Sequence, residues 1–274
     1  MPLSKMKKIW SYCTYNKPFF LLVFILFFVL EYFMDTYSNF NTKRAFLIVM
    51  LINIILCGYG MTISRDRMND GIRLPKIMIK DIIVLGIKSY IVFTVYLLVQ
   101  GYVLDLICSP LNFPEFDLEE MLLKLPETLH TLYSHNPVDA LAFIIIGSIL
   151  FYITSFFMEI ALARLADTNN FKTAFNLLKI KSDIDLIGWR SYAKEFTAIV
   201  LAIVLFGALK YIVIPVEILN YIWNVFLDLL LISAQFLGIG AIYSRIKEKK
   251  SNFDISKSQW MKKVITIFVV CQWN

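Results

Sequence analysis

The sequence predicts an all-α protein, a polytopic integral membrane helix bundle that crosses the bilayer six times. Three observations lead to this prediction. Of the 274 residues, 58% are hydrophobic, and the mean hydropathy is +0.66, which lies above the range of soluble globular proteins. Six apolar stretches each approach the roughly 20 residues that a spanning helix needs. The lysines and arginines between these stretches fall on alternate connections.

The six predicted spans follow one another along most of the chain. In order they cover residues 18–34, 45–63, 81–107, 138–162, 195–217 and 222–243. The first is an uncleaved span, because the residues after its apolar core contain no small-x-small cleavage site of a signal peptide. The predicted domains are therefore a six-span transmembrane domain over 1–250 and a basic amphipathic tail over 251–274. The tail's apolar run is too short to cross, so we expect it to lie on the membrane.

The basic residues set the predicted orientation. Of the 27 lysines and arginines, 22 lie in the N-terminal segment, the second and fourth connections, and the tail. The positive-inside rule places these segments, and with them both termini, in the cytoplasm of a protein of the cell membrane. Five or seven crossings would break the alternation. The expected partners at this face are the lipid bilayer and its anionic headgroups.

The second, fourth and sixth spans end in a similar way. Each leaves the membrane through a small residue followed by an arginine, at Arg65, Arg164 and Arg245. This recurrence predicts three αα-hairpin repeats, formed by spans one and two, three and four, and five and six. An alternative that needs no repeat stays open: any span that ends on the cytoplasmic side tends to have an arginine at the interface.

Two connections have helical patterns of their own. Residues 170–181 form a predicted amphipathic helix at the cytoplasmic interface, with Thr168, Asn169 or Asn170 as its N-cap. The outer connection 108–137 is acidic, and its leucines recur at three- and four-residue steps, which predicts two short helices on the outer surface. That connection is interpreted either as a lid or cation-attracting vestibule, or as an acidic solvated face over packed leucines.

Charged residues at membrane depth are the first candidates for function, because burying a charge there is costly. Lys210 and Asp228 lie nine residues on either side of Leu219, so a turn at Leu219 would bring them to the same depth as a pair. Gln235 shares the helix face of Asp228. Lys88 and Glu159 form a second candidate pair near the cytoplasmic ends of their spans. For both pairs the alternative is a structural contact between helices or a lysine that snorkels to an interface.

The sequence lacks the motifs of common catalytic sites. It has no Walker loop, no GxSxG and no GxGxxG, and the four cysteines have no CxxC spacing. The only histidines, His130 and His135, are five residues apart, which turns the second ring away from a shared metal. We therefore predict no enzymatic activity, no cofactor, no metal and no nucleic-acid partner. The best alternative, a membrane-embedded hydrolase or transferase, would use an inner-face cluster of Arg65, Glu159, Arg164 and Asp167.

Several cytoplasmic motifs resemble those of one prokaryotic family. They are Gly58-Tyr59, Arg65, Gly71, Leu74-Pro75, Gly86-Ile87-Lys88, and the stretches 161–166, 171–175 and 187–192. Over residues 10–250 the chain is similar to the mainly archaeal, multi-pass membrane family catalogued as domain of unknown function 4013. The resemblance implies a six-span membrane domain. It implies no activity, because the family has no assigned catalytic residues to carry over.

Two functional interpretations stay open. The first is a non-enzymatic membrane scaffold, or an accessory module that binds a membrane-protein partner or a second copy of itself. The second is a permease for a small molecule or lipid that uses the intramembrane charges. If the five polar residues at membrane depth converge on one water-accessible cavity, transport is favoured. If they pair separately in dry contacts, a scaffold is favoured.

Overall fold

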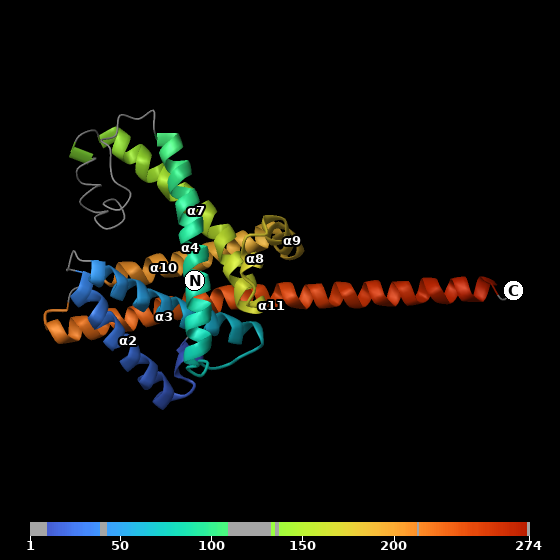
Figure 1. The fold of residues 1–274 in the computed structure, drawn as a ribbon, viewed down its shortest axis with the longest axis horizontal. Coiled ribbons are helices and arrows are strands. Elements are labelled where there is room, and N and C mark those ends of the chain that lie inside the picture. The colour runs from blue at the N-terminus through green and yellow to red at the C-terminus, as the bar shows by residue number, and fades with distance from the viewer. Residues whose placement is uncertain (1–9, 39–42, 109–132, 135–136, 213, 273–274) are drawn as a thin grey trace. The chain divides into compact units, whose positions relative to one another are not determined.

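The computed structural model of the chain describes residues 10–38, 43–108, 133–134, 137–212 and 214–272 (Figure 1). The regular structure of these residues is helical. The main helices are α2 (Lys17–Ser38), α3 (Lys43–Met68), α4 (Ile79–Cys108), α7 (Pro137–Thr168), α8 (Phe171–Ala174), α9 (Leu177–Ile187), α10 (Trp189–Leu209) and α11 (Glu217–Gln272). The chain divides into two compact units. Unit 1 comprises Met1–Tyr90 and Ile160–Asn274, and unit 2 comprises Ile91–Glu159, so α4 and α7 contribute to both.

Five of the described helices are long and apolar enough to cross a membrane. These stretches are Leu47–Met68, Ile79–Cys108, Ala140–Thr168, Trp189–Leu209 and Ile218–Asn252, and they correspond to the second to sixth predicted spans. The first predicted span, 18–34, falls on α2, whose described apolar stretch Lys17–Leu30 is shorter. The all-α class is thus confirmed, whereas the six crossings and the hairpin repeat stay predictions. The outer connection, with His130 and His135, lies almost wholly outside the described residues.

The fifth apolar helix begins and ends earlier than predicted. α10 occupies Trp189–Leu209 where the sequence suggested 195–217. Its start is set by Gly188, whose φ of 87° lies in the left-handed region that favours glycine. At its other end, the amides of residues 210–212 form tight i→i−3 hydrogen bonds, and Pro215 in the following connection has no amide hydrogen to continue a helix.

The sixth predicted span is part of a much longer helix. α11 runs without a break from Glu217 to Gln272, through the predicted boundary between residues 250 and 251. No proline or glycine occurs after Gly240 in this stretch to end the helix. The backbone of the tail is therefore helical, while its association with a membrane stays a prediction.

The predicted amphipathic helix over 170–181 is interrupted. The structure has the short α8 followed by α9, because two asparagine side chains bind backbone amides and start each helix separately. The Oδ1 atom of Asn170 accepts a hydrogen bond of 3.0 Å from the amide of Lys172, and Oδ1 of Asn176 accepts one of 3.0 Å from the amide of Lys179. Asn170 is thus the N-cap among the three candidates.

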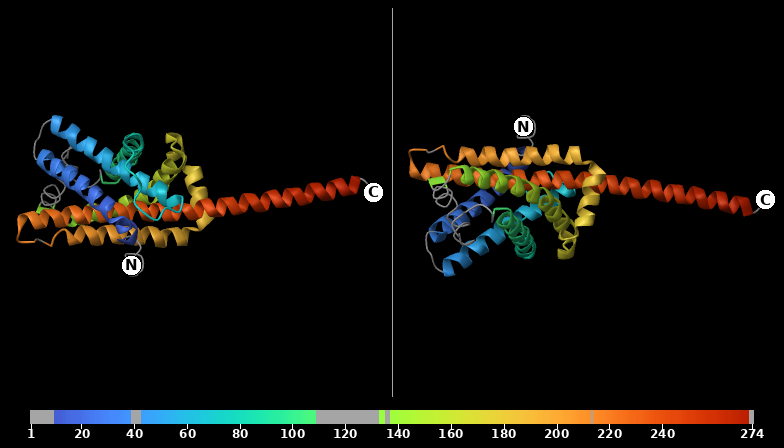
Figure 2. Two further views of the ribbon diagram at one scale, coloured as in Figure 1. Left: turned by 90° about the horizontal axis from the view of Figure 1, so that it is seen from below. Right: turned by 90° about the horizontal axis from the view of Figure 1, so that it is seen from above.

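Unit 1 is held together by close helix packing. α10 lies alongside α11, and α3 packs against α2 and α11 (Figure 2). Where α3 meets α4, Gly58 and Gly86 face each other so closely that a Cβ on Gly58 would collide with the carbonyl oxygen of Ile82. Small residues that let backbones approach are typical of helix contacts within membranes.

Unit 2 consists of the later part of α4 and the earlier part of α7, within the residues that the structure describes. A Cβ on Gly147 of α7 would lie 3.9 Å from Leu104 Cδ2 of α4, so the two helices touch there. Leu98 and Val99 on α4 are each 60% exposed. Such apolar exposure suits a surface that meets lipid.

Candidate functional site

The three arginines that follow spans two, four and six lie at one end of unit 1, here called the basic end. Arg65 Nε donates a hydrogen bond of 2.7 Å to the carbonyl oxygen of Ala166 at the end of α7. Arg164 Nη1 lies 2.5 Å from Asp183 Oδ2 of α9, and Arg245 forms an ion pair with Glu195 of α10. Each predicted interfacial arginine therefore connects its own helix to another one: Arg65 connects α3 to α7, Arg164 connects α7 to α9, and Arg245 connects α11 to α10.

A short stretch of α11 holds three other helices through charge. Besides the Arg245–Glu195 pair, Lys247 Nζ lies 2.8 Å from Asp167 Oδ1 of α7, and Lys250 Nζ lies 2.6 Å from Asp183 Oδ1 of α9. We call these six residues, together with Arg164, which shares Asp183, the α11 clamp. The clamp joins α7, α9, α10 and α11.

Asp183 is the most buried member of the clamp. Its side chain is 2% exposed, and Arg164 beside it is 7% exposed, so two charges have been withdrawn from solvent together. Lys250 also lies 5.9 Å from the ring centre of Tyr243, within the range of a cation–π contact. Asp183 was not among the predicted site residues. Its spacing could have indicated that it is buried, because it shares one face of α9 with the buried residues Ile180 and Ile184.

The second charged feature is the pair of Lys210 and Asp228. Lys210 Nζ lies 2.7 Å from Asp228 Oδ1 and 2.8 Å from Oδ2, so the structure brings these two predicted residues together. The hairpin differs from the expected one, which turned at Leu219. Lys210 is the C-cap of α10, and α11 begins at Glu217, so Leu219 already lies in α11. Gln235 lies seven residues after Asp228 on α11 and is half-buried.

Lys88, the lysine of the second predicted pair, contacts Asn169. Its Nζ donates to the carbonyl oxygen of Asn169 at 2.7 Å and to Asn169 Oδ1 at 2.9 Å, at the basic end of unit 1. Glu159 is buried and belongs to unit 2. A pairing of Lys88 with Glu159 stays a prediction. In the alternative inner-face cluster, Arg164 is engaged with Asp183 and Asp167 with Lys247.

A groove of about 650 Å³ lies between α10 and α11, with helical residues 10–14 and the end of α3 at its mouth. Its floor is apolar and rich in small residues, and its mouth is polar. The mouth residues are Tyr12, Arg67, Glu195 and Arg245. Tyr12 Oη donates a hydrogen bond of 2.7 Å to Asp66 Oδ2, and burial together with this bond raises the pKa of Tyr12.

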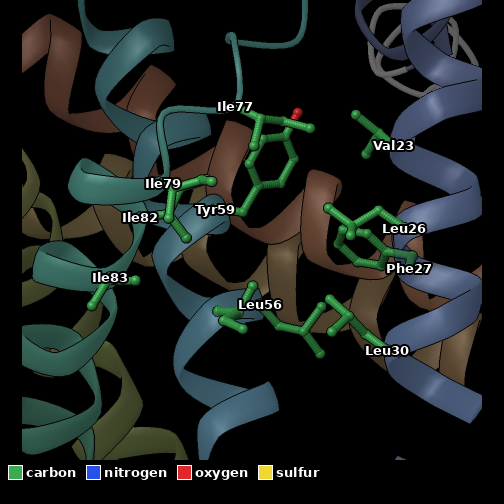
Figure 3. A pocket seen from close by; sticks show the side chains of 11 residues that line it. Val23, Leu26, Phe27, Leu30, Leu56, Tyr59, Ile77, Ile79, Ile82 and Ile83 are labelled. Atoms are coloured by element: carbon green, nitrogen blue, oxygen red, sulfur yellow. The ribbon is translucent and has the colours of Figure 1, made fainter. Parts of the chain in front are cut away.

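A second cavity of about 270 Å³ lies between α2, α3 and the start of α4. Apart from Tyr59 its lining is aliphatic or phenylalanine side chains, and Figure 3 shows Phe27 and Leu30 of α2 across from Leu56 of α3. The Tyr59 hydroxyl donates to the carbonyl oxygen of Pro75 at 3.4 Å. This lining offers shape and hydrophobic contact but no charged group.

The polar residues at membrane depth do not line either cavity. Lys88, Lys210, Asp228 and Gln235 are absent from the linings of both the groove and the apolar cavity. Within the described residues no three His, Cys, Asp or Glu side chains lie together in a way that could hold a metal ion. Burial raises the pKa of the Cys13 thiol to about 11, so this thiol is a poor nucleophile near neutral pH.

Long helices that are apolar enough to cross a membrane, glycine-mediated crossings and charge pairs near helix ends characterise this all-helical domain. The chain belongs to the family described as protein of unknown function (DUF4013), whose profile matches residues 45–218, more than half of the chain. The match runs from α3 to the start of α11 and is narrower than the 10–250 suggested by the motifs. Neither the curated proteins nor the solved structures gave a match.

Proposed function

We propose that the chain is a non-enzymatic membrane scaffold, an accessory module that binds a membrane-protein partner or a second copy of itself. One observation carries the proposal: three of the five polar residues predicted at membrane depth, Lys88, Lys210 and Asp228, are used in separate contacts. Lys210 pairs with Asp228 at one end of α10, and Lys88 binds Asn169 at the basic end. A transport path would need such groups to line a common water-accessible cavity.

The proposed orientation places the basic end, both termini and the clamp at the cytoplasmic face of a prokaryotic cell membrane. It is supported by the alternation of basic connections, with 22 of the 27 lysines and arginines in four segments. Anionic headgroups are then the immediate neighbours of the exposed lysines of α9, Lys179 and Lys181. A tag placed after Asn274 tests this directly. Labelling of the tag in intact cells by an impermeant reagent would contradict the orientation.

The scaffold proposal is tested by affinity purification of the full chain in a mild detergent, followed by quantitative mass spectrometry of proteins. We expect a membrane protein, or a differently tagged second copy, to be retained at a defined ratio. The control is a parallel purification of an unrelated six-span protein at equal expression. Equal recovery of every protein in the two samples, with no self-association, would contradict the proposal.

A permease for a small molecule or lipid is the second candidate, and the groove between α10 and α11 favours it because its floor reaches into the apolar part of unit 1. Transport requires that this groove open in turn to both sides. Uptake of solutes into vesicles containing the purified chain tests this candidate. Uptake that Ala198→Phe, a change in the groove lining, abolishes without unfolding would favour the permease over the scaffold.

A further inference from the structure

We propose that the groove between α10 and α11 binds one anionic phospholipid, with its phosphate at Arg67 and Arg245 and an acyl chain along the groove floor. The site goes beyond the scaffold role, but it rests on the proposed placement of the basic end at the depth of the headgroups. Basic pockets between transmembrane helices on this side commonly hold anionic lipid headgroups.

The depth of the groove fits one leaflet. Along α11 its lining extends from Arg245 at the mouth to Ala234 on the floor. These residues are eleven positions apart, which is about 16 Å at 1.5 Å per residue. Half of a hydrocarbon core about 30 Å thick is nearly the same length. A lipid whose headgroup sits at Arg245 would therefore extend its chain to the middle of the bilayer.

The floor of the groove is suited to an alkyl chain. It is formed by Ala198, Ile199 and Ala202 of α10 and by Leu237 and Gly238 of α11. Ala198 and Ala202 present small side chains along this floor. The volume of about 650 Å³ lies within the roughly 300–1,000 Å³ typical of sites for small molecules. An alkyl chain there would replace lipid-exposed surface with continuous hydrophobic contact.

The mouth of the groove carries the complementary charge. Arg67 uses Nη1 in a 3.2 Å bond to the carbonyl oxygen of Gly71, and its Nε and Nη2 bind no other residue that the structure describes. Arg245 is 45% exposed and shares its charge with Glu195. Among the residues that line the groove, two arginines stand against one glutamate, and Asp66, which accepts the Tyr12 hydrogen bond, lies beside the mouth without lining it. The planar guanidinium of Arg67 can present two donors to a phosphate.

The test is native mass spectrometry of the full chain in detergent, with dioleoyl phosphatidylglycerol or dioleoyl phosphatidylcholine added at equal mole ratio. We expect a one-to-one adduct with phosphatidylglycerol at least tenfold more abundant than with phosphatidylcholine. Ala198→Phe plugs the floor and Arg67→Gln removes the phosphate donor, and each should reduce the adduct at least tenfold. Leu201→Phe, on the same helix but outside the groove, and Arg190→Gln, an exposed arginine outside it, should stay within twofold of the parent.

Several results would overturn the site. They are equal retention of the two lipids, equal loss in the control variants, or an equal rise in melting temperature with inorganic phosphate alone. A dimer in the parent that Ala198→Phe dissociates, without a lipid adduct, would assign the groove to a second copy. If Ala198→Phe does not fold, the lipid adducts of Ala198→Leu and of Arg67→Gln are compared with that of the parent instead. If affinity purification retains no partner protein, the scaffold proposal fails but the lipid site does not, because lipid retention is measured on the purified chain alone.

Discussion

Asp183 should be among the residues whose loss costs this protein most stability. It is buried in α9 between Arg164 of α7 and Lys250 of α11, with side-chain exposures of 2%, 7% and 40% in that order. Replacing Asp183 with Asn keeps the shape of the side chain but removes its charge. Arg164 would then remain buried without a counter-charge, which typically costs about 3–5 kcal/mol.

The expected effect can be divided between the two contacts. Lys250 is partly exposed, so the loss of its ion pair lowers the free energy of unfolding by at most about 1 kcal/mol. Most of the loss therefore comes from Arg164. For a chain of this size, about 2–4 °C of melting temperature corresponds to each kcal/mol, so Asp183→Asn should melt about 6–20 °C lower. Lys250→Gln should melt within about 4 °C of the parent by the same conversion.

The assay is thermal unfolding of the purified chain in detergent, followed by the loss of helical circular dichroism. A double variant supplies the internal check. Arg164→Met with Asp183→Leu replaces both charges by apolar groups and should recover much of the stability lost in Asp183→Asn. A melting temperature of Asp183→Asn within about 2 °C of the parent, or a double variant less stable than either single change, would refute the reasoning.

Three further predictions concern other contacts. Asp228→Asn should melt several degrees below the parent, because Lys210 loses a charge-assisted bond of roughly 1.5–3 kcal/mol; an unchanged melting temperature would mean that solvent replaces the bond. Gly58→Ala should destabilise or unfold the chain, since the added Cβ collides with the backbone of α4. Gly207→Ala, whose Cβ meets nothing within 4 Å, should stabilise the chain by about 0.5–1 kcal/mol. Equal melting temperatures of the two variants would contradict the close crossing of α3 and α4. Because the pKa of Cys13 is raised from 9.0 to about 11, the folded chain keeps this proton longer than the unfolded chain, so stability should fall between pH 9 and pH 11 by about 2 kcal/mol more in the parent than in Cys13→Ala. Parallel pH profiles of these last two proteins would show that the thiol makes no such contribution.

Much of the architecture is readable from the sequence, because length and apolarity are local properties of each segment. The positions of α3, α4 and α7 agree with the predicted spans to within a few residues. The ends of helices were harder to predict. Gly188 and Pro215 shifted α10 by several residues, and Asn176 divided a helix whose apolar spacing looked continuous. Single residues with special backbone or capping behaviour outweighed the periodic pattern at those points.

The charged contacts were predictable only where the pattern supplied both partners. Lys210 and Asp228 were visible as isolated charges in apolar surroundings, and the structure brings them together. Asp183 and Glu195 lie in segments already rich in charge, and only the spacing of Asp183 to Ile180 and Ile184 set either apart from an ordinary surface acid. Their partners on α11 come 67 and 50 residues later for Lys250 and Arg245, a separation that only the tertiary fold resolves.

The continuity of α11 makes the clamp sensitive to insertions. One added residue between Gly240 and Ser244 would rotate everything beyond it by about 100° and advance it by about 1.5 Å. Arg245, Lys247 and Lys250 would then turn away from all three acids together, and no loop between them could absorb the change. Even an insertion of a whole turn, which restores the phase, would move these three side chains about 5.4 Å along the axis, whereas an insertion after Lys250 leaves all three contacts in place.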